Sequence, residues 1–213
     1  MPIPLYFAVN CKENVTLSDT KALPFSCGMT KNGELRFPQS FWSETPLLLD
    51  DAIPVPPTAR CLQKIKELSS KGCILDFERQ PSGFHFVLIQ KLREMKISPL
   101  WLPERFFSYA PNATAIVTHN LPHNSWKQFC LSQQRRFPKG WALEMQPLKC
   151  TKKLPQAQKP REYFLQEALC QCCVQGDRIT YYDTRQTLLK KLHVAEEYGC
   201  QGAIALWSEW PEK

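Results

Sequence analysis

The segment Lys71–Gln80, KGCILDFERQ, combines a run of apolar residues with two closely spaced acids, Asp76 and Glu78. In a β-strand, residues two apart point to the same face of the sheet, so both carboxylates are expected to project together. The near-continuous apolar run before them is typical of a strand buried on both faces of a parallel sheet. The segment therefore predicts a buried parallel strand that ends in two acids on one face.

Similar apolar runs recur along almost the whole chain. Besides Cys73–Glu78, they are Leu5–Asn10, Leu23–Met29, Leu47–Ala52, Pro99–Glu104, Ala115–Asn120, Trp141–Gln146 and Ala203–Trp210. Each is short enough for a strand, and most lack the strict alternation of a half-exposed one. These eight runs are the predicted strands.

Helical patterns lie between the better-separated runs, beginning near Thr58, Phe84, Ser125 and Asp183. In the last of them we expect Asp183 to cap the N-terminus, with Gln186 three residues further on, and Gly199 to end the helix. Strands that alternate with helices predict βα units around a parallel sheet.

Eight strands of this kind predict an α/β fold, a single compact (β/α)8 TIM barrel over residues 1–213, with short early βα connections. The alternative is an open doubly wound sheet. It is less favoured because no glycine-rich phosphate-binding turn follows the first strand.

The composition is that of a globular protein, with 43% hydrophobic and 22% charged residues among 213. The start of the chain, MPIPLYFAVN, has no basic group before its apolar stretch, so it predicts a strand and not a signal peptide. No apolar run approaches the roughly 20 residues that cross a bilayer. The ten cysteines are scattered, several in apolar contexts where a reduced thiol acts as a small hydrophobe. We expect a reduced, cytoplasmic protein with no membrane span.

The net charge of +7 is not concentrated in a dense basic tract. The most basic segment, Lys149–Arg161, also contains proline and glutamine, and we predict an exposed surface loop there. Contact with nucleic acid is the less favoured alternative, so nucleic acid is not an expected partner.

Two clusters invite a metal interpretation. The cysteines of LCQCCVQG, residues 169–176, lack a second CxxC pair or nearby ligand histidines. His119 and His123 are four apart, but Pro122 disfavours the helix that would bring them together. We therefore predict no metal site, and no cofactor is expected.

Polar residues gather at the C-terminal ends of the predicted strands, where (β/α)8 barrels build their active sites. They are Asn10, Asp50, Asp51, Asp76, Glu78, Glu104, His119, Asn120, Glu144, Gln146 and Glu209. Five aromatic residues near these ends offer flat apolar faces to a sugar ring, although core packing is the competing role for each. These aromatics are Tyr6, Trp101, Trp126, Trp141 and Trp207.

In its last two acids, KGCILDFE resembles the DxxDxDxE motif of the family 18 glycoside hydrolases, the chitinases and related spore-cortex-lytic enzymes. The resemblance implies that Glu78 is the proton donor and that Asp76 orients the N-acetyl group of the substrate. Lys71 and Ile74 stand where the first two aspartates of the motif occur.

Two further segments are similar to this family. VTHN, residues 117–120, occupies the place of the MxYD motif, with His119 and Asn120 in place of tyrosine and aspartate. Trp207 matches the tryptophan that ends the eighth strand and forms the floor under the sugar. We therefore expect substrate contacts from His119, Asn120 and Trp207, and from four residues at the strand ends, Tyr6, Asp50, Glu144 and Gln146.

Two functions remain open. The first is a glycoside hydrolase that cleaves an N-acetylhexosamine-containing glycan by substrate-assisted, retaining hydrolysis, in which the acetamido oxygen of the substrate is the nucleophile. The alternative is a catalytically inactive barrel that binds a glycan or a protein partner. Glu78 distinguishes them, because only the hydrolase requires its proton.

Overall fold

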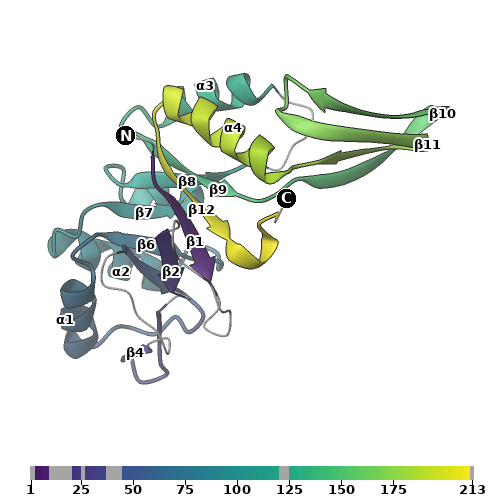
Figure 1. The fold of residues 1–213 in the computed structure, drawn as a ribbon. Helices are drawn as coiled ribbons and strands as arrows, with labels where there is room; N and C mark the ends of the chain where they lie inside the picture. Colours follow the sequence, from purple (N-terminus) through teal and green to yellow (C-terminus); the bar gives the residue numbers. More distant parts are fainter. Residues whose placement is uncertain (1–2, 10–20, 25–26, 37–44, 120–124, 212–213) are drawn as a thin grey trace. The chain divides into compact units, whose positions relative to one another are not determined.

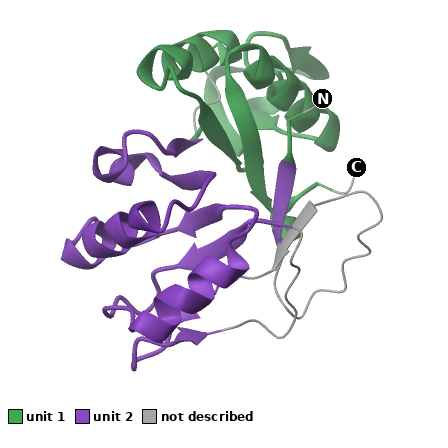
Figure 2. Ribbon diagram, turned by 90° about the vertical axis from the view of Figure 1, so that its left-hand side faces the viewer, with its two compact units in different colours: residues 1–4, 118–213 green, residues 5–117 purple. Residues whose placement is uncertain are grey.

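A computed structural model of the chain describes residues 3–9, 21–24, 27–36, 45–119 and 125–211. It divides into two compact units (Figure 2). The N-terminal unit is Leu5–Val117, and the C-terminal unit combines Met1–Pro4 with Thr118–Lys213. Both units contain parallel strands and helices (Figure 1), so the chain is a mixed α/β protein.

The strands of the N-terminal unit pair mostly in parallel. Four of them form a ladder in chain order: β5 Leu47–Asp50, β6 Cys73–Asp76, β7 Leu100–Pro103 and β8 Thr114–Thr118. A second parallel pair is formed by β1 Leu5–Val9 and β2 Lys21–Pro24. The short strands β3 Gly28–Met29 and β4 Leu35–Arg36 are antiparallel. In the ladder, Asp50 of β5 lies in register with Asp76 of β6.

Helices connect the strands of this ladder. They are α1 Ala59–Leu68, α2 Gly83–Glu94 and the 3-10 helix η1 Glu104–Tyr109. Thr58 caps α1 by accepting a hydrogen bond from the backbone N–H of Cys61 at 3.1 Å. The predicted helices that begin near Thr58 and Phe84 are thus confirmed.

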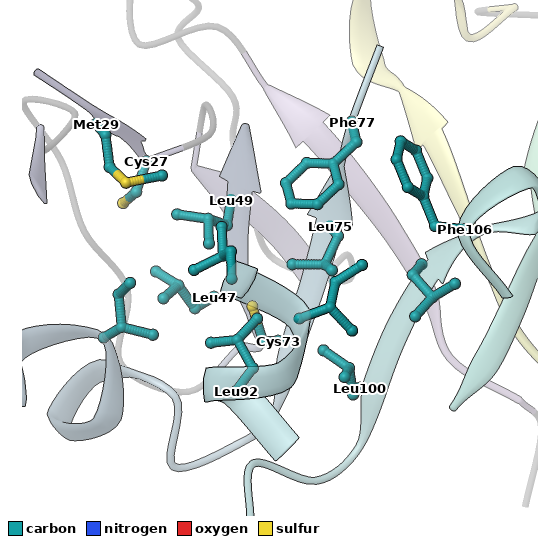
Figure 3. Packing of buried hydrophobic residues seen from close by; sticks show 14 of the residues in the cluster. Cys27, Met29, Leu47, Leu49, Cys73, Leu75, Phe77, Leu92, Leu100 and Phe106 are labelled. Carbon is teal, nitrogen blue, oxygen red and sulfur yellow. The ribbon is translucent and has the colours of Figure 1, made fainter. Parts of the chain in front are cut away.

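The core of the N-terminal unit lies where alternate strand residues meet these helices (Figure 3). Leu47 and Leu49 of β5 pack with Leu75 of β6, and Leu92 of α2 packs over them. Gly72 leads into β6 with φ of +100°, and a Cβ there would lie 2.4 Å from the Pro99 carbonyl oxygen. Only glycine therefore allows the chain to enter this strand so close to β7.

The C-terminal unit pairs β9 Trp141–Met145 in parallel with β12 Cys200–Leu206. Its helices are α3 Trp126–Arg136, α4 Arg185–Glu197 and the 3-10 helix η2 Trp207–Glu209. The indole N–H of Trp126 in α3 donates to the carbonyl oxygen of Lys191 in α4 at 2.9 Å, which joins the two helices. Gly199 follows α4 with φ of +82°, as predicted for the residue that ends it.

A long antiparallel ribbon extends away from α3 and α4 in this unit (Figure 1). It consists of β10 Lys149–Leu165 and β11 Cys170–Tyr182, with register shifts between Lys153 and Arg161. The inner side chains of its two strands, among them Cys170, Cys172 and Val174, form a small apolar cluster of their own.

Most predicted elements are confirmed, and the parallel βα order is confirmed within each unit. Each apolar run contains strand residues, although Leu23–Met29 is divided between β2, which ends at Pro24, and β3, which begins at Gly28. The loop predicted at Lys149–Arg161 is wrong, because these exposed residues belong to β10 and pair with β11.

The N-cap predicted for the last helix is also wrong. The Thr184 hydroxyl caps α4 by accepting from the backbone N–H of Thr187 at 3.2 Å, and the Thr187 hydroxyl accepts from the backbone N–H of Thr184 at 2.8 Å. The carboxylate of Asp183 is buried and binds Lys191 instead, with Nζ–O distances of 2.8 and 2.7 Å. Asp183 therefore forms an ion pair inside the unit.

The nine cysteines in the described part of the chain are free thiols. Burial raises the pKa of Cys27 and Cys61 to about 11, and that of Cys130 and Cys200 to about 12. No group of three or more His, Cys, Asp or Glu among the described residues is placed to hold a metal ion. No helix within the described ranges is both long and apolar enough to span a membrane.

Replacing Leu75 by Ala is expected to lower the free energy of unfolding by about 2–5 kcal/mol, because Leu75 is fully buried and its truncation leaves a cavity. The control is Val87→Ala on the exposed face of α2, where the side chain is 46% accessible and the cost should stay below about 1 kcal/mol. Urea unfolding of the two variants measures the difference. Equal costs would show that the core does not lie on this face of β6.

Candidate active site

Asp76, the last residue of β6, and Glu78, two residues beyond it, point away from the core. Leu75 and Phe77 are buried in the core cluster, whereas Asp76 and Glu78, which alternate with them, are exposed. This alternation follows from the two-residue period of a strand. Both carboxylates therefore lie at or just beyond the C-terminal end of β6 and are exposed, where a ligand can reach them.

Asp50 lies beside Asp76 at the end of the neighbouring strand. Its carboxylate accepts a hydrogen bond from Arg36 Nη2 at 2.7 Å and one from the backbone N–H of Ala52 at 3.0 Å. A Cβ on Gly28 would lie 2.3 Å from Asp50 Oδ1, so only glycine leaves room for this carboxylate. Asp50 thus brings a fixed negative charge, partly neutralised by Arg36, next to the acids of β6.

Two aromatic residues of the N-terminal unit pack against each other. The rings of Tyr6 and Trp101 meet edge to face, with centroids 5.8 Å apart. Trp101 is buried in register with Ile74, on the same side of the sheet as the acids. Tyr6 is partly buried, and this burial raises the pKa of its hydroxyl. Trp101 serves packing here, and Tyr6 retains some exposed surface.

In the C-terminal unit, the end of β9 carries a small polar network. The Gln146 amide donates to Glu144 Oε1 at 2.9 Å, and the Thr118 hydroxyl donates to Glu144 Oε2. Glu144 and Gln146 are thus hydrogen-bonded to each other at the end of β9. Trp207, also half-buried, directly follows β12 as the first residue of η2.

His119 follows β8 and packs its ring against Trp126 and Phe129, with centroids 4.8 and 4.6 Å away. Its Nε2 atom is buried and has no hydrogen-bond partner among the described residues. Burial, and then the positive charge of Lys191, lower the pKa of His119 to about 4. The ring is therefore neutral at neutral pH. Asn120, predicted beside it, lies outside the described residues.

The predicted site residues are thus distributed over both units. Tyr6, Asp50, Asp76 and Glu78 belong to the N-terminal unit, and His119, Glu144, Gln146 and Trp207 belong to the C-terminal unit. Within the units, Asp50 is brought next to Asp76, and Glu144 is hydrogen-bonded to Gln146.

The structure also reveals a pair that the sequence did not indicate. The Nε2 atom of His85 in α2 lies 2.8 Å from Asp51 Oδ2, and both side chains are almost fully buried. The two residues are 34 positions apart, so no local pattern could have revealed the contact.

A hollow of about 490 Å³ lies elsewhere in the N-terminal unit, along α1 and β4. Its walls are formed mainly by charged and polar side chains, including Glu34, Arg60, Lys64 and Glu67. None of the residues that line it belongs to the predicted site, so we attach no catalytic role to it.

No known family model matches the sequence, and no curated protein is significantly similar to it. Solved structures, however, are similar over nearly the whole chain. The class V chitinase of Nicotiana tobaccum matches 97% of this chain and 94% of its own, with a TM-score of 0.59 and 10% identity. The spore cortex-lytic enzyme SleL of Bacillus megaterium matches 97% of this chain and 70% of its own, with a TM-score of 0.59 and 9% identity.

A family 18 chitinase of Cycas revoluta, crystallised with (GlcNAc)4, matches 96% of this chain and 94% of its own. Its TM-score is 0.56 at 12% identity. At this level of identity the similarity concerns the fold. It confirms that the chain resembles the family 18 chitinases and spore cortex-lytic enzymes in its fold, as the KGCILDFE segment implied.

The buried His119 predicts a specific sensitivity to acid. Because its pKa is about 4 in the folded chain and near 6.5 when unfolded, protons bind the unfolded state first as the pH falls between these values. Native stability should therefore be fully present above pH 6.5 and decline toward pH 4. The loss should be roughly 1–2 kcal/mol after allowance for solvent screening of a partly exposed ring.

Denaturant unfolding across this pH range tests the effect in His119→Phe, which has no titrating ring and should lose less stability than the wild type. His193, whose side chain is 75% exposed, provides the control, because His193→Gln should leave the slope unchanged. A wild-type slope in His119→Phe would contradict the assignment of the acid response to this residue.

Proposed function

We propose that the protein is a chitinase-like glycoside hydrolase of the family 18 type, with Glu78 as proton donor on a (β/α)8 barrel. The observation that carries the proposal is the placement of Asp76 and Glu78. Both are exposed at the C-terminal end of a parallel strand, on the side away from the core, in a chain whose fold resembles that of family 18 enzymes.

The proposed chemistry needs one proton donor and one orienting group. Glu78 gives its proton to the glycosidic oxygen as the bond to the leaving sugar breaks. Asp76 holds the acetamido group of the substrate so that its oxygen attacks the anomeric carbon from the opposite side. A water molecule then attacks the resulting intermediate and gives a proton to Glu78. The anomeric configuration is retained.

The departures from the family motif are compatible with this chemistry. Ile74, which takes the place of the second aspartate, is buried in the strand and supplies no carboxylate beside Asp76. Asp50 of the neighbouring strand lies in register with Asp76 and brings a carboxylate to the same strand end. We propose that Asp50 provides the acidic environment that the motif position lacks.

The proposed substrate is an oligosaccharide that contains N-acetylglucosamine. The support comes from the Cycas revoluta enzyme, which was crystallised with (GlcNAc)3, (GlcNAc)4 and allosamidin. Trp207 would lie under a sugar ring, and the other proposed contacts are Tyr6, Asp50, His119, Asn120, Glu144 and Gln146.

The central test is Glu78→Gln, which keeps the shape of the side chain but has no acidic proton to transfer. The rate of (GlcNAc)4 hydrolysis, followed by chromatography of the products, should be at least about 100-fold lower in this variant than in the wild type, the lower end of the range for a general acid. Affinity for (GlcNAc)4, measured by calorimetry, should change little. Glu197→Gln, at an exposed position at the end of α4, is the matched control and should retain turnover.

Full turnover in Glu78→Gln would overturn the assignment of the proton donor. Absence of turnover in the wild type, with (GlcNAc)4 still bound, would instead identify an inactive glycan-binding barrel.

A further inference from the structure

The backbone that carries Glu78 is held by one buried carboxylate. Asp51, which directly follows β5, accepts a hydrogen bond from the backbone N–H of Glu78 through Oδ1 and one from that of Arg79 through Oδ2. Both donor–acceptor distances are 3.0 Å. Two successive peptide groups are therefore tied to the neighbouring strand, at the point where the chain leaves β6.

His85 of α2 completes the coordination of this carboxylate. Its Nε2 atom lies 2.8 Å from Asp51 Oδ2, and the His85 and Asp51 side chains are only 1% and 3% accessible. The backbone N–H of Ser82 donates to Nδ1 at 3.1 Å. A backbone N–H can only donate, so Nδ1 is the acceptor and Nε2 carries the proton that binds Asp51.

The His85 ring is fixed by its neighbours. Phe77, Phe84 and Phe106 surround it, with ring centroids 5.0, 5.1 and 4.8 Å away. The imidazole therefore cannot turn away from Asp51 without displacing core side chains.

Two arginines clamp the same segment from outside. Arg79 donates from Nε to the carbonyl oxygen of Asp51 at 3.0 Å and from Nη2 to that of Ala52 at 2.9 Å. Arg105 of η1 donates to the carbonyl oxygen of Phe77. Hydrogen bonds thus fix the peptide groups on both sides of Glu78, while its side chain stays exposed.

We propose that Asp51 and His85 are positioning residues that fix the backbone of Glu78, so that its carboxyl group is aimed at the glycosidic oxygen. The catalytic role of this inference rests on the proposed function. A general acid must lie within hydrogen-bond reach of the oxygen it protonates. A side chain on an unrestrained loop would leave this geometry for much of the time, and small displacements of this kind reduce rates severely.

The anchoring can be measured without any turnover, from amide hydrogen exchange by NMR in Asp51→Asn. The asparagine side chain replaces one acceptor oxygen by an NH₂ group, which faces the donors of Arg79 and His85. We expect the amides of Glu78 and Arg79 to exchange at least about 10-fold faster, relative to the amide of Ile65 inside α1. In hydrolysis of (GlcNAc)4, kcat should fall at least about 10-fold with KM within about twofold, because only proton transfer depends on the aim of Glu78.

Asp183→Asn is the matched control. Asp183 is the buried carboxylate of the C-terminal unit, where it accepts from the backbone N–H of Leu148 and from Lys191. This variant loses a comparable buried network in the other unit. The exchange rates of the Glu78 and Arg79 amides relative to that of Ile65 should stay as in the wild type. The value of kcat should change less than twofold. If Asp51→Asn does not fold, Arg79→Ala at an exposed position removes the outer clamp, and the exchange of the Glu78 amide should rise at least about threefold.

Unchanged exchange at Glu78 and Arg79 in Asp51→Asn would overturn the anchoring. Faster exchange with an unchanged kcat would overturn the positioning role. Should the wild type show no hydrolysis, the proposed function fails, and the exchange rates still decide whether Asp51 holds the segment.

Discussion

The alternation of side chains along β6 is the constraint from which the rest of this structure follows. Leu75 and Phe77 must enter the core because they are large and apolar, and the strand geometry then places Asp76 and Glu78 on the opposite side. A shift of the register by one residue would bury both acids and expose two core side chains. The burial of apolar surface therefore also fixes the direction of the acids, and Gly72 admits this strand beside β7.

In each unit a buried aspartate holds a backbone segment that follows or precedes a strand. Asp51 binds backbone groups after β6 together with a neutral histidine, whereas Asp183 binds the backbone of Leu148 together with the charged Lys191. Breaking a buried ion pair such as Asp183–Lys191 costs about 3–5 kcal/mol because the remaining charge loses its partner. In the N-terminal unit the hydrogen bonds of Asp51 hold the backbone of the exposed Glu78. The Asp51 network is therefore relevant to function as well as to stability.

The sequence predicted those parts of the fold that depend on local patterns. The run Cys73–Glu78 located β6, and Thr58 located the start of α1. The failures concern contacts between distant residues. Lys149–Arg161 has few strand-forming residues and becomes a strand because β11 pairs with it. Asp183 and Thr184 are both suitable caps, and only the buried Lys191 decides between them. For the site, the acids of β6 could be predicted, but the Asp51–His85 contact required the fold.

The β10–β11 ribbon has a consequence for the behaviour of the protein in solution. A two-stranded sheet exposes unpaired peptide groups along both outer edges, and such edges recruit strands from other molecules. The exposed residues of β10 include Lys152, Lys153, Lys159 and Arg161. A strand from a second copy would bring the same positive charges against them, so mutual repulsion discourages self-association. Acetylation of the three lysines would remove most of that repulsion. The edges of the β10–β11 ribbon could then pair with strands of other molecules and promote aggregation.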